Sequence, residues 1–196
     1  MVRTIILFAL LMCSVWLPLQ AQQSWPVKIG VMDHSLSIPN FWFLRYGFNP
    51  TVTVGTEYTL KQKGGHQLFL SGNLGAYHQQ KVETGIFLQT DISYRYQWKQ
   101  WYAGIGLGPG YAHTFFTTPE YRYGEGDFSD ASKVGHSYFM LAAGLELGYQ
   151  FNESPTSPRV ALQFREQLYS PLSLYNGFHQ LVGVSFSFFP FTNSNN

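Results

Sequence analysis

The chain has 196 residues, a length that suits one domain, and only 12% of them are charged, against about 25% in ordinary globular proteins. Aromatic residues make up 18%, glycine occurs 19 times and the formal net charge is +1. The sequence has no basic face that would favour nucleic acid as a partner. Its composition is typical of a chain whose outer surface does not face water.

Residues 1–21 have the pattern of a secretory signal peptide. Arg3 supplies a positive start, an apolar run covers residues 5–19, and Ala21 is a small residue at a cleavage point. That run is shorter than the ~20 residues that a membrane-spanning helix needs. Cys13, the only cysteine, lies inside this segment, so cleavage leaves no disulfide or thiolate chemistry. We therefore expect an exported domain that begins at residue 22.

Alternation of apolar residues with small or polar ones recurs from about residue 50 to residue 188. Successive side chains of a β-strand point to opposite faces, so Leu88 and Ile92 share one face while Asp91 and Arg95 share the other. The segments with this split are 52–58, 67–74, 85–96, 101–115, 138–149, 160–165 and 178–188. Residues 27–38 form a less regular candidate for the first strand. The pattern predicts about eight strands.

The composition of the two faces indicates which one is inside. The second face is mostly Gly, Ala and Ser with isolated charges, which is a poor solvent face but can fill a narrow barrel. The large apolar face then contacts lipid. We predict an all-β fold, a transmembrane antiparallel up-and-down β-barrel of about eight strands.

The links between strands agree with this topology. Short periplasmic turns are predicted at 61–65, 99–100 and 152–158, and outer loops at 39–49, 78–83, 116–135 and 170–177. The longest link falls outside, as is usual in such barrels. Aromatic residues are expected to form belts at the two membrane boundaries. The predicted outer belt is Tyr77, Phe115, Phe116, Tyr138, Tyr169 and Phe178.

By this architecture, residues 22–191 resemble the small outer-membrane β-barrel proteins of Gram-negative bacteria. Segment 178–188 is similar to the terminal strand that such proteins present to the barrel-assembly machinery, although here Phe188 and Phe191 precede a polar tail, 192–196. The resemblance implies an outer-membrane location, contact with membrane lipid including lipopolysaccharide, and the assembly machinery as a partner during insertion. The fold does not choose a function, because it carries anchors, adhesins, narrow pores and lipid-modifying enzymes.

Five charged residues fall on the inward face: Glu57, Asp91, Arg95, Glu146 and Arg165. A lone charge in a narrow interior is costly, so we expect these residues to pair in a polar network. Such a network either plugs the barrel or forms a gated or proton-conducting path. The plug is favoured, because about eight strands leave little open lumen.

The pairs His34–Ser35 and His136–Ser137 are the candidate catalytic residues. A serine nucleophile needs its base within hydrogen-bond reach, yet neighbours in a strand point to opposite faces. Neither pair is therefore a local dyad, and a site would have to combine strands, for example His136 with Ser35. The other histidines are expected at rims or in loops, and they show no metal-ligand spacing: His66, His78, His113 and His179. No metal or cofactor is predicted.

The sequence favours a non-enzymatic outer-membrane barrel with a plugged polar interior, which anchors or binds through its extracellular loops. One alternative is an integral outer-membrane lipid-modifying enzyme, either an acyl hydrolase or an acyltransferase. The other alternative is a narrow ion or proton pore.

Overall fold

The structure is a computed structural model that describes residues 25–36, 48–80, 82–116, 121–124, 127–130, 135–170 and 177–190, with the backbone alone for 121–124 and 127–130. The predicted signal peptide, residues 1–21, and the polar tail, 192–196, lie outside the described residues, as do most of three predicted outer loops. The described residues contain no helix with the length and apolar character needed to cross a membrane.

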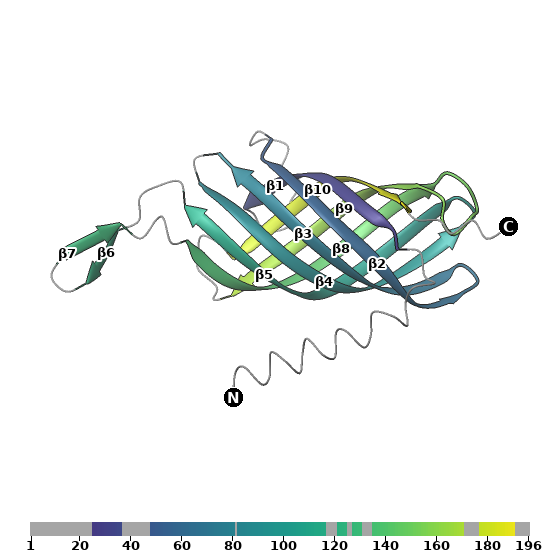
Figure 1. Cartoon of the computed structure of the whole chain (residues 1–196), viewed down its shortest axis with the longest axis horizontal. Helices are drawn as coiled ribbons and strands as arrows, with labels where there is room; N and C mark the ends of the chain where they lie inside the picture. Colours follow the sequence, from purple (N-terminus) through teal and green to yellow (C-terminus); the bar gives the residue numbers. More distant parts are fainter. Residues whose placement is uncertain are drawn as a thin grey trace, which may run out of the picture.

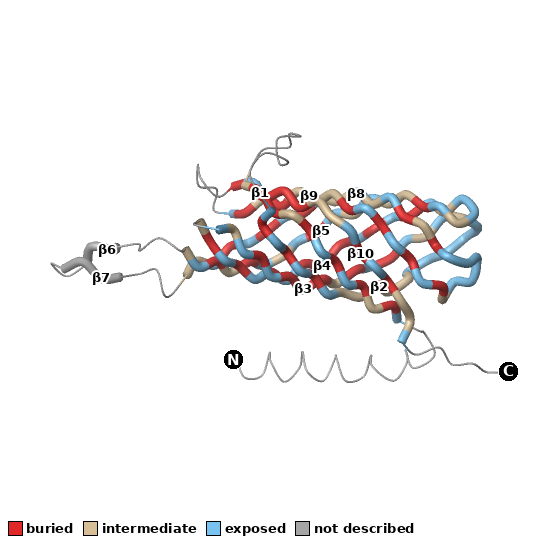
Figure 2. Tube along the Cα trace, turned by 90° about the horizontal axis from the view of Figure 1, so that it is seen from above, coloured by how far each residue is buried: buried red, intermediate tan, exposed pale blue. Residues whose placement is uncertain are grey.

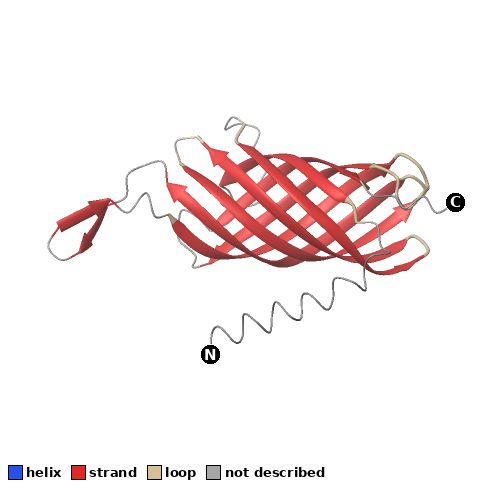
Figure 3. Ribbon diagram, viewed as in Figure 1, coloured by secondary structure: helices blue, strands red, loops and turns tan. Residues whose placement is uncertain are grey.

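Eight strands close into one antiparallel barrel, in the order β1-β10-β9-β8-β5-β4-β3-β2, with β2 paired to β1 (Figures 1 and 3). The barrel strands are β1 (Val27–Leu36), β2 (Pro50–Lys63), β3 (His66–Gln79), β4 (Glu83–Trp98), β5 (Trp101–Phe116), β8 (His136–Gln150), β9 (Arg159–Ser170) and β10 (Phe178–Phe188). The hairpin β6 (Tyr121–Gly124) and β7 (Asp127–Asp130) is a separate two-stranded sheet. The predicted eight-stranded barrel is confirmed, including its first strand.

The alternation of side chains sets the two faces of the wall. Along β4, buried and exposed residues alternate almost without interruption, and the same stripes appear on the other strands in Figure 2. Leu88 and Ile92 are 56% and 60% exposed on the outside, whereas Asp91 and Arg95 are 2% exposed inside. A soluble protein would bury the large apolar residues, so this distribution is that of a lipid-facing barrel.

The two ends of the barrel differ in their links. Val27 pairs with both Phe188 and Thr56, so the barrel begins and ends at the same end, which we call the inner end. The links at 64–65, 99–100 and 151–158 lie there, and the other four links lie at the opposite, outer end. Strands β2, β3 and β4 run further than predicted, which reduces the turn 61–65 to Gly64 and Gly65 and the loop 78–83 to residues 80–82.

The outer half of the barrel interior is filled by aromatic and apolar side chains. The buried cluster contains Met32, Tyr77, Phe87, Ala112, Tyr138, Met140, Tyr169 and Leu181. Tyr77, Tyr138 and Tyr169 were predicted in the outer aromatic belt, and that assignment is wrong. These tyrosines belong to the inward-facing set of β3, β8 and β9, and Tyr169 is fully buried.

An arginine on the outer wall tests whether this wall faces lipid. We expect Leu107→Arg, at an exposed position in the middle of β5, to lower the free energy of unfolding in lipid vesicles by roughly 2–4 kcal/mol. The control is Leu60→Arg, near the inner-end turn of β2, where a loss of only about 0–1 kcal/mol is expected. Equal, negligible losses at both sites, measured by denaturant titration, would contradict a membrane-facing wall, because exposed positions of soluble proteins tolerate such changes.

Candidate functional site

Arg95 lies at the centre of a charged network in the inner half of the lumen. Its Nη1 and Nη2 groups donate to the two carboxylate oxygens of Glu57 at 3.1 and 2.9 Å. Its Nε and Nη2 donate to Oε1 of Glu146 at 2.9 and 2.6 Å, and Nη1 also donates to Gln67 Oε1 at 3.1 Å. All five guanidinium N–H groups therefore have an acceptor. The network joins β4 to β2 and β8 across the lumen.

Two aromatic rings enclose the same guanidinium. Its carbon lies 4.4 Å from the ring centre of Phe69 and 4.7 Å from that of Tyr102. Both distances are within the range of cation–π attraction. Arg95 is thus paired through its N–H edge and packed on aromatic side chains, and its side chain has little freedom to move.

Lys28 and Arg159 complete this network. Lys28 Nζ lies 3.0 Å from Glu146 Oε2 and 3.5 Å from Glu57 Oε1, and Arg159 Nη2 donates to Glu57 Oε2 at 3.1 Å. Three cations thus surround two carboxylates. Sequence reasoning missed both cations, because Lys28 lies in the poorly alternating first strand and Arg159 immediately precedes the recognised segment of β9. The signal was the shared inward face of Arg159, Gln163 and Arg165.

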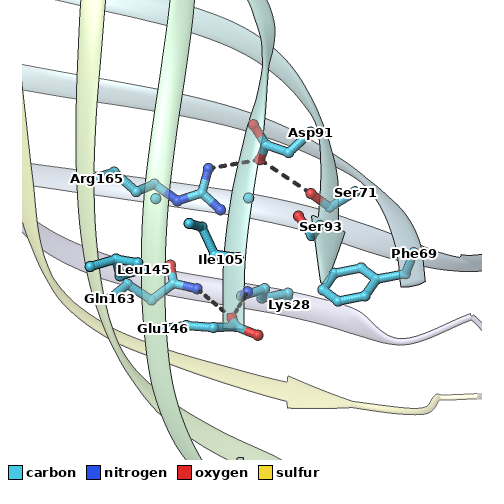
Figure 4. Close-up of a pocket in the computed structure, with 12 residues that line it drawn as sticks. Lys28, Phe69, Ser71, Asp91, Ser93, Ile105, Leu145, Glu146, Gln163 and Arg165 are labelled. Carbon is cyan, nitrogen blue, oxygen red and sulfur yellow. Dashed lines mark hydrogen bonds and ion pairs between the residues drawn. The ribbon is translucent and has the colours of Figure 1, made fainter. Parts of the chain in front are cut away.

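A second layer lies nearer the middle of the barrel. Arg165 Nη1 donates to Asp91 Oδ2 at 3.0 Å, and Ser71 Oγ and Asn73 Nδ2 donate to the same oxygen at 3.2 and 3.4 Å. Gln89 Nε2 donates to the other oxygen of Asp91. Figure 4 shows Ser71, Asp91 and Arg165 of this layer on one side of the cavity, and Glu146 with its partners Lys28 and Gln163 on the other. The cavity between the two layers has a volume of about 20 Å³, room for roughly one water molecule.

The five charged residues predicted for the lumen all lie inside the barrel wall. The structure brings Glu57, Arg95 and Glu146 into one network and places Asp91 with Arg165 in the other. Of the predicted glutamines, Gln67 belongs to the first network, Gln89 to the second, and Gln163 Nε2 donates to Glu146 at 3.3 Å. Together with Lys28 and Arg159, the lumen carries four cations and three carboxylates in these layers.

The candidate His34 faces the lumen in its outer half. Its Nε2 lies 2.8 Å from Nδ1 of His179, and its ring stacks on Tyr77 at 4.1 Å. Tyr77 donates to Glu83 Oε1 at 2.7 Å, and His179 stacks on Tyr169 at 3.8 Å. His179 was predicted at a rim or in a loop, and this is wrong, because it is fully buried inside. Its inward position follows from the alternation of β10.

The candidate Ser35 lies on the outer face of the wall, the face of Ile29 and Val31. In the ladder, Ser35 is the partner of Gln180 on β10, and Gln180 is in turn the partner of Glu166 on β9. The side chains of these last two residues are also joined, since Gln180 Nε2 donates to Glu166 Oε1 at 2.8 Å. Ser35 is buried, and its hydroxyl has no hydrogen-bond partner among the described residues. The combination of Ser35 with His136 does not form, since β9 and β10 separate the two strands and the residues face opposite sides of the wall.

His136 and Ser137 also face opposite sides. His136 faces inward, where its ring lies 5.3 Å from Phe116 and 6.4 Å from Tyr138. Ser137 faces outward, and its hydroxyl oxygen lies 3.0 Å from Nδ1 of His113 and accepts a hydrogen bond from Tyr111 at 2.7 Å. The structure therefore brings Ser137 to a histidine that is distant in sequence instead of to its neighbour. No group of three His, Cys, Asp or Glu in the described part could hold a metal ion.

Comparisons with known proteins address the fold. No model of a protein family matches the sequence, and the search of curated proteins gave no match. The structure is similar to that of the outer-membrane enzyme PagL, with a TM-score of 0.51, 10% identity, and coverage of 83% of this chain and 98% of that one. The chain has the fold of the small outer-membrane β-barrels.

Two further solved structures are similar at lower TM-scores. The N-terminal β-barrel domain of Pseudomonas aeruginosa OprF has a TM-score of 0.49 and 16% identity, and covers 83% of this chain and 97% of its own. Neisserial surface protein A has a TM-score of 0.49 and 10% identity, with coverage of 84% and 94%. Identities this low transfer no activity to this chain.

Removal of Arg95 tests how far the inner network stabilises the barrel. We expect Arg95→Met to lower the free energy of unfolding by about 3–5 kcal/mol, because Glu57 and Glu146 lose their shared cation. The control is Lys63→Met, which also replaces a cation by methionine, but at an exposed position at the inner end of β2. It should change the free energy of unfolding by under about 0.5 kcal/mol. Urea titration of both variants in the same detergent measures the difference, and similar small values would show that the network is not stabilising.

Proposed function

We propose that this protein is an integral outer-membrane barrel with a plugged lumen, which anchors in the membrane and presents its outer loops. The observation that carries the proposal is the position of Arg95, which bridges carboxylates of β2 and β8 across the lumen. A barrel of eight strands has an interior just wide enough for side chains to fill. Bridged in this way, the described residues of the inner half leave no wide aqueous path.

The inner mouth of the barrel supports the same conclusion. A hollow of about 220 Å³ opens there between Pro26, Gln67, Thr156 and Phe189. Its lining includes Glu57 and Arg159, which are joined by the hydrogen bond of the inner network. Solvent at this mouth therefore meets an ion pair, and the cavity between the two charged layers has room for roughly one water molecule.

The outer half is closed by different chemistry. His34, Tyr169 and His179 are fully buried there, in ring contact with Tyr77 or with one another. Stacked rings therefore fill the lumen in the outer half, as charged side chains fill it in the inner half. A solute path would have to displace both layers, which is why we favour an anchor over an ion or proton pore.

The outer wall and the links supply the rest of the proposal. The apolar outer face suits outer-membrane lipid, lipopolysaccharide included, and export through the predicted signal peptide leads to that location. The barrel-assembly machinery is the proposed partner during insertion, through the terminal strand β10. Recognition tends to lie on loops held by a rigid scaffold. The link between β5 and β8, which contains the β6–β7 hairpin, is the proposed contact segment.

Conductance distinguishes a plugged anchor from a pore. In planar bilayers we expect no steady channel from the purified full-length protein, and open events from the double variant Arg95→Ser with Glu146→Ser. This variant removes the bridge from β4 to β8 without changing net charge. The control pair, Lys63→Ser with Glu153→Ser, makes the same exchange at exposed inner-end positions and should stay closed. A steady channel in the unaltered protein would contradict the plug.

Binding by the loop needs a separate measurement. Replacing residues 117–134 by a short Gly-Ser link should leave the barrel closed, so that unboiled protein still migrates faster than boiled protein on an SDS gel. Adhesion of cells that display the protein to immobilised host or bacterial surfaces should fall to the level of cells lacking it. Unchanged adhesion in the folded, shortened protein would exclude this loop as the contact segment.

A further inference from the structure

A serine and a histidine from neighbouring strands meet on the outer wall, outside the lumen that the proposed function concerns. His113 of β5 and Ser137 of β8 are direct partners in the ladder, and Nδ1 of the histidine lies 3.0 Å from the serine hydroxyl. Tyr111, two residues before His113 on the same face, donates its hydroxyl proton to Ser137 Oγ at 2.7 Å. The arrangement is a nucleophile within hydrogen-bond reach of a base, with a second donor beside it.

These side chains lie at the outer edge of the apolar belt. Ser137 is the first outward-facing residue of β8, and Phe139 and Leu141 follow it on the same face. Ser137 and Tyr111 are exposed, the tyrosine by 51%. The edge of the apolar belt is the level at which lipid acyl chains meet their polar headgroups. Ester bonds that link acyl chains to a lipid lie at this level, within reach of the Ser137 hydroxyl.

The backbone and a neighbouring ring position the imidazole. Gly135, with φ of +70°, passes so close that a Cβ there would lie 2.8 Å from His113 Nε2. Phe115 packs edge-on against the imidazole, with ring centres 4.7 Å apart. The β5–β8 register runs without a shift from Trp101 to Thr114. A group held by regular strands and packed against a neighbouring ring is preorganised for one contact.

We propose that Ser137 and His113 form a catalytic pair that hydrolyses ester-linked acyl chains of outer-leaflet lipids. Ser137 Oγ attacks the ester carbonyl carbon while its proton passes to His113 Nδ1. The bond to the lipid alcohol breaks, and the alcohol oxygen takes that proton, which leaves the acyl group on Ser137. Water, the only co-reactant, then attacks this ester and gives a proton to His113. A fatty acid leaves as the Ser137 oxygen recovers the proton.

Tyr111 has a defined part in this reaction. Its O–H group donates to Ser137 Oγ, and as Oγ bonds to the carbonyl carbon this donor turns to the neighbouring oxygen that becomes negatively charged. A donor at such a position stabilises the charge that develops in the transition state. The reaction needs His113 with its proton on Nε2, so that Nδ1 accepts the proton from the serine.

The chain offers a matched control on the adjoining strands of the same wall. His78 of β3 and Thr84 of β4 are also direct ladder partners at the outer end, exposed, with Nδ1 2.8 Å from the threonine hydroxyl. This contact joins a histidine to a secondary alcohol. Substitutions of His78 and Thr84 therefore test whether any rim histidine–hydroxyl contact has the activity.

The experiment uses the purified full-length protein in two kinds of vesicle, phosphatidylethanolamine alone and phosphatidylethanolamine with lipopolysaccharide. Mass spectrometry measures released fatty acid, and a fluorophosphonate probe tests for a reactive serine. We expect release from at least one vesicle, labelling of Ser137, and loss of release by at least 100-fold in Ser137→Ala and His113→Asn. Tyr111→Phe should reduce release by about 10- to 100-fold. His78→Ala and Thr84→Ala should match the unaltered protein.

Each variant is first shown to be folded on an SDS gel, where the unboiled sample must migrate faster than the boiled one. Release from phosphatidylethanolamine alone would identify phospholipid as the ester source, and release only with lipopolysaccharide would identify the acylated saccharide. No release from either vesicle by the folded, unaltered protein would overturn the proposal. Equal release by the unaltered protein and Ser137→Ala would overturn it too. Neither result would affect the plug, which the conductance measurement tests.

Discussion

The rest of the structure depends on how eight strands fill the space they enclose, and Arg95 is the residue around which the filling is arranged. A charged side chain in a narrow interior is tolerated only when its hydrogen-bonding groups are satisfied. Arg95 meets this condition through Glu57 on β2, Glu146 on β8 and Gln67 on β3. Three strands apart from its own are thereby held at fixed positions around the lumen, and the remaining cations, Lys28 and Arg159, pair with the same two carboxylates.

The lumen is divided by chemistry along its length. Ion pairs fill the inner half, and tyrosine, histidine, methionine and leucine side chains fill the outer half. Both fillings join strands that are not neighbours in the wall, so they resist deformation of the barrel as well as passage of solutes. A filled interior leaves the outside of the wall and the links as the surfaces available for contact. Function is therefore to be sought on these surfaces, where the exposed chemistry lies.

Much of this arrangement was predictable from the alternation of apolar residues with small or polar ones along each strand. The parity of each segment identified the outward apolar face and placed Glu57, Asp91, Arg95, Glu146 and Arg165 inside. Tyr77, Tyr138 and Tyr169 were assigned to the membrane boundary by their place near strand ends, although their parity is that of the lumen face. Both a lumen and a membrane boundary accept aromatic residues, so residue type did not correct the assignment. Partners across strands were not predictable at all. They depend on register, which pairs Ser137 with His113 although its sequence neighbour is His136.

The filled lumen and the outer wall are connected through that register. A contact between side chains of two strands keeps its length only while the strands do not slide or separate. Glu146 ties β8 to Arg95 of β4, and β5 lies between these two strands in the wall. The ion pair inside thus restrains both neighbours of the strand that carries Tyr111 and His113. In a protein with mobile interior packing, an exposed serine and histidine would meet only part of the time. Here the charged interior holds the wall that keeps them together.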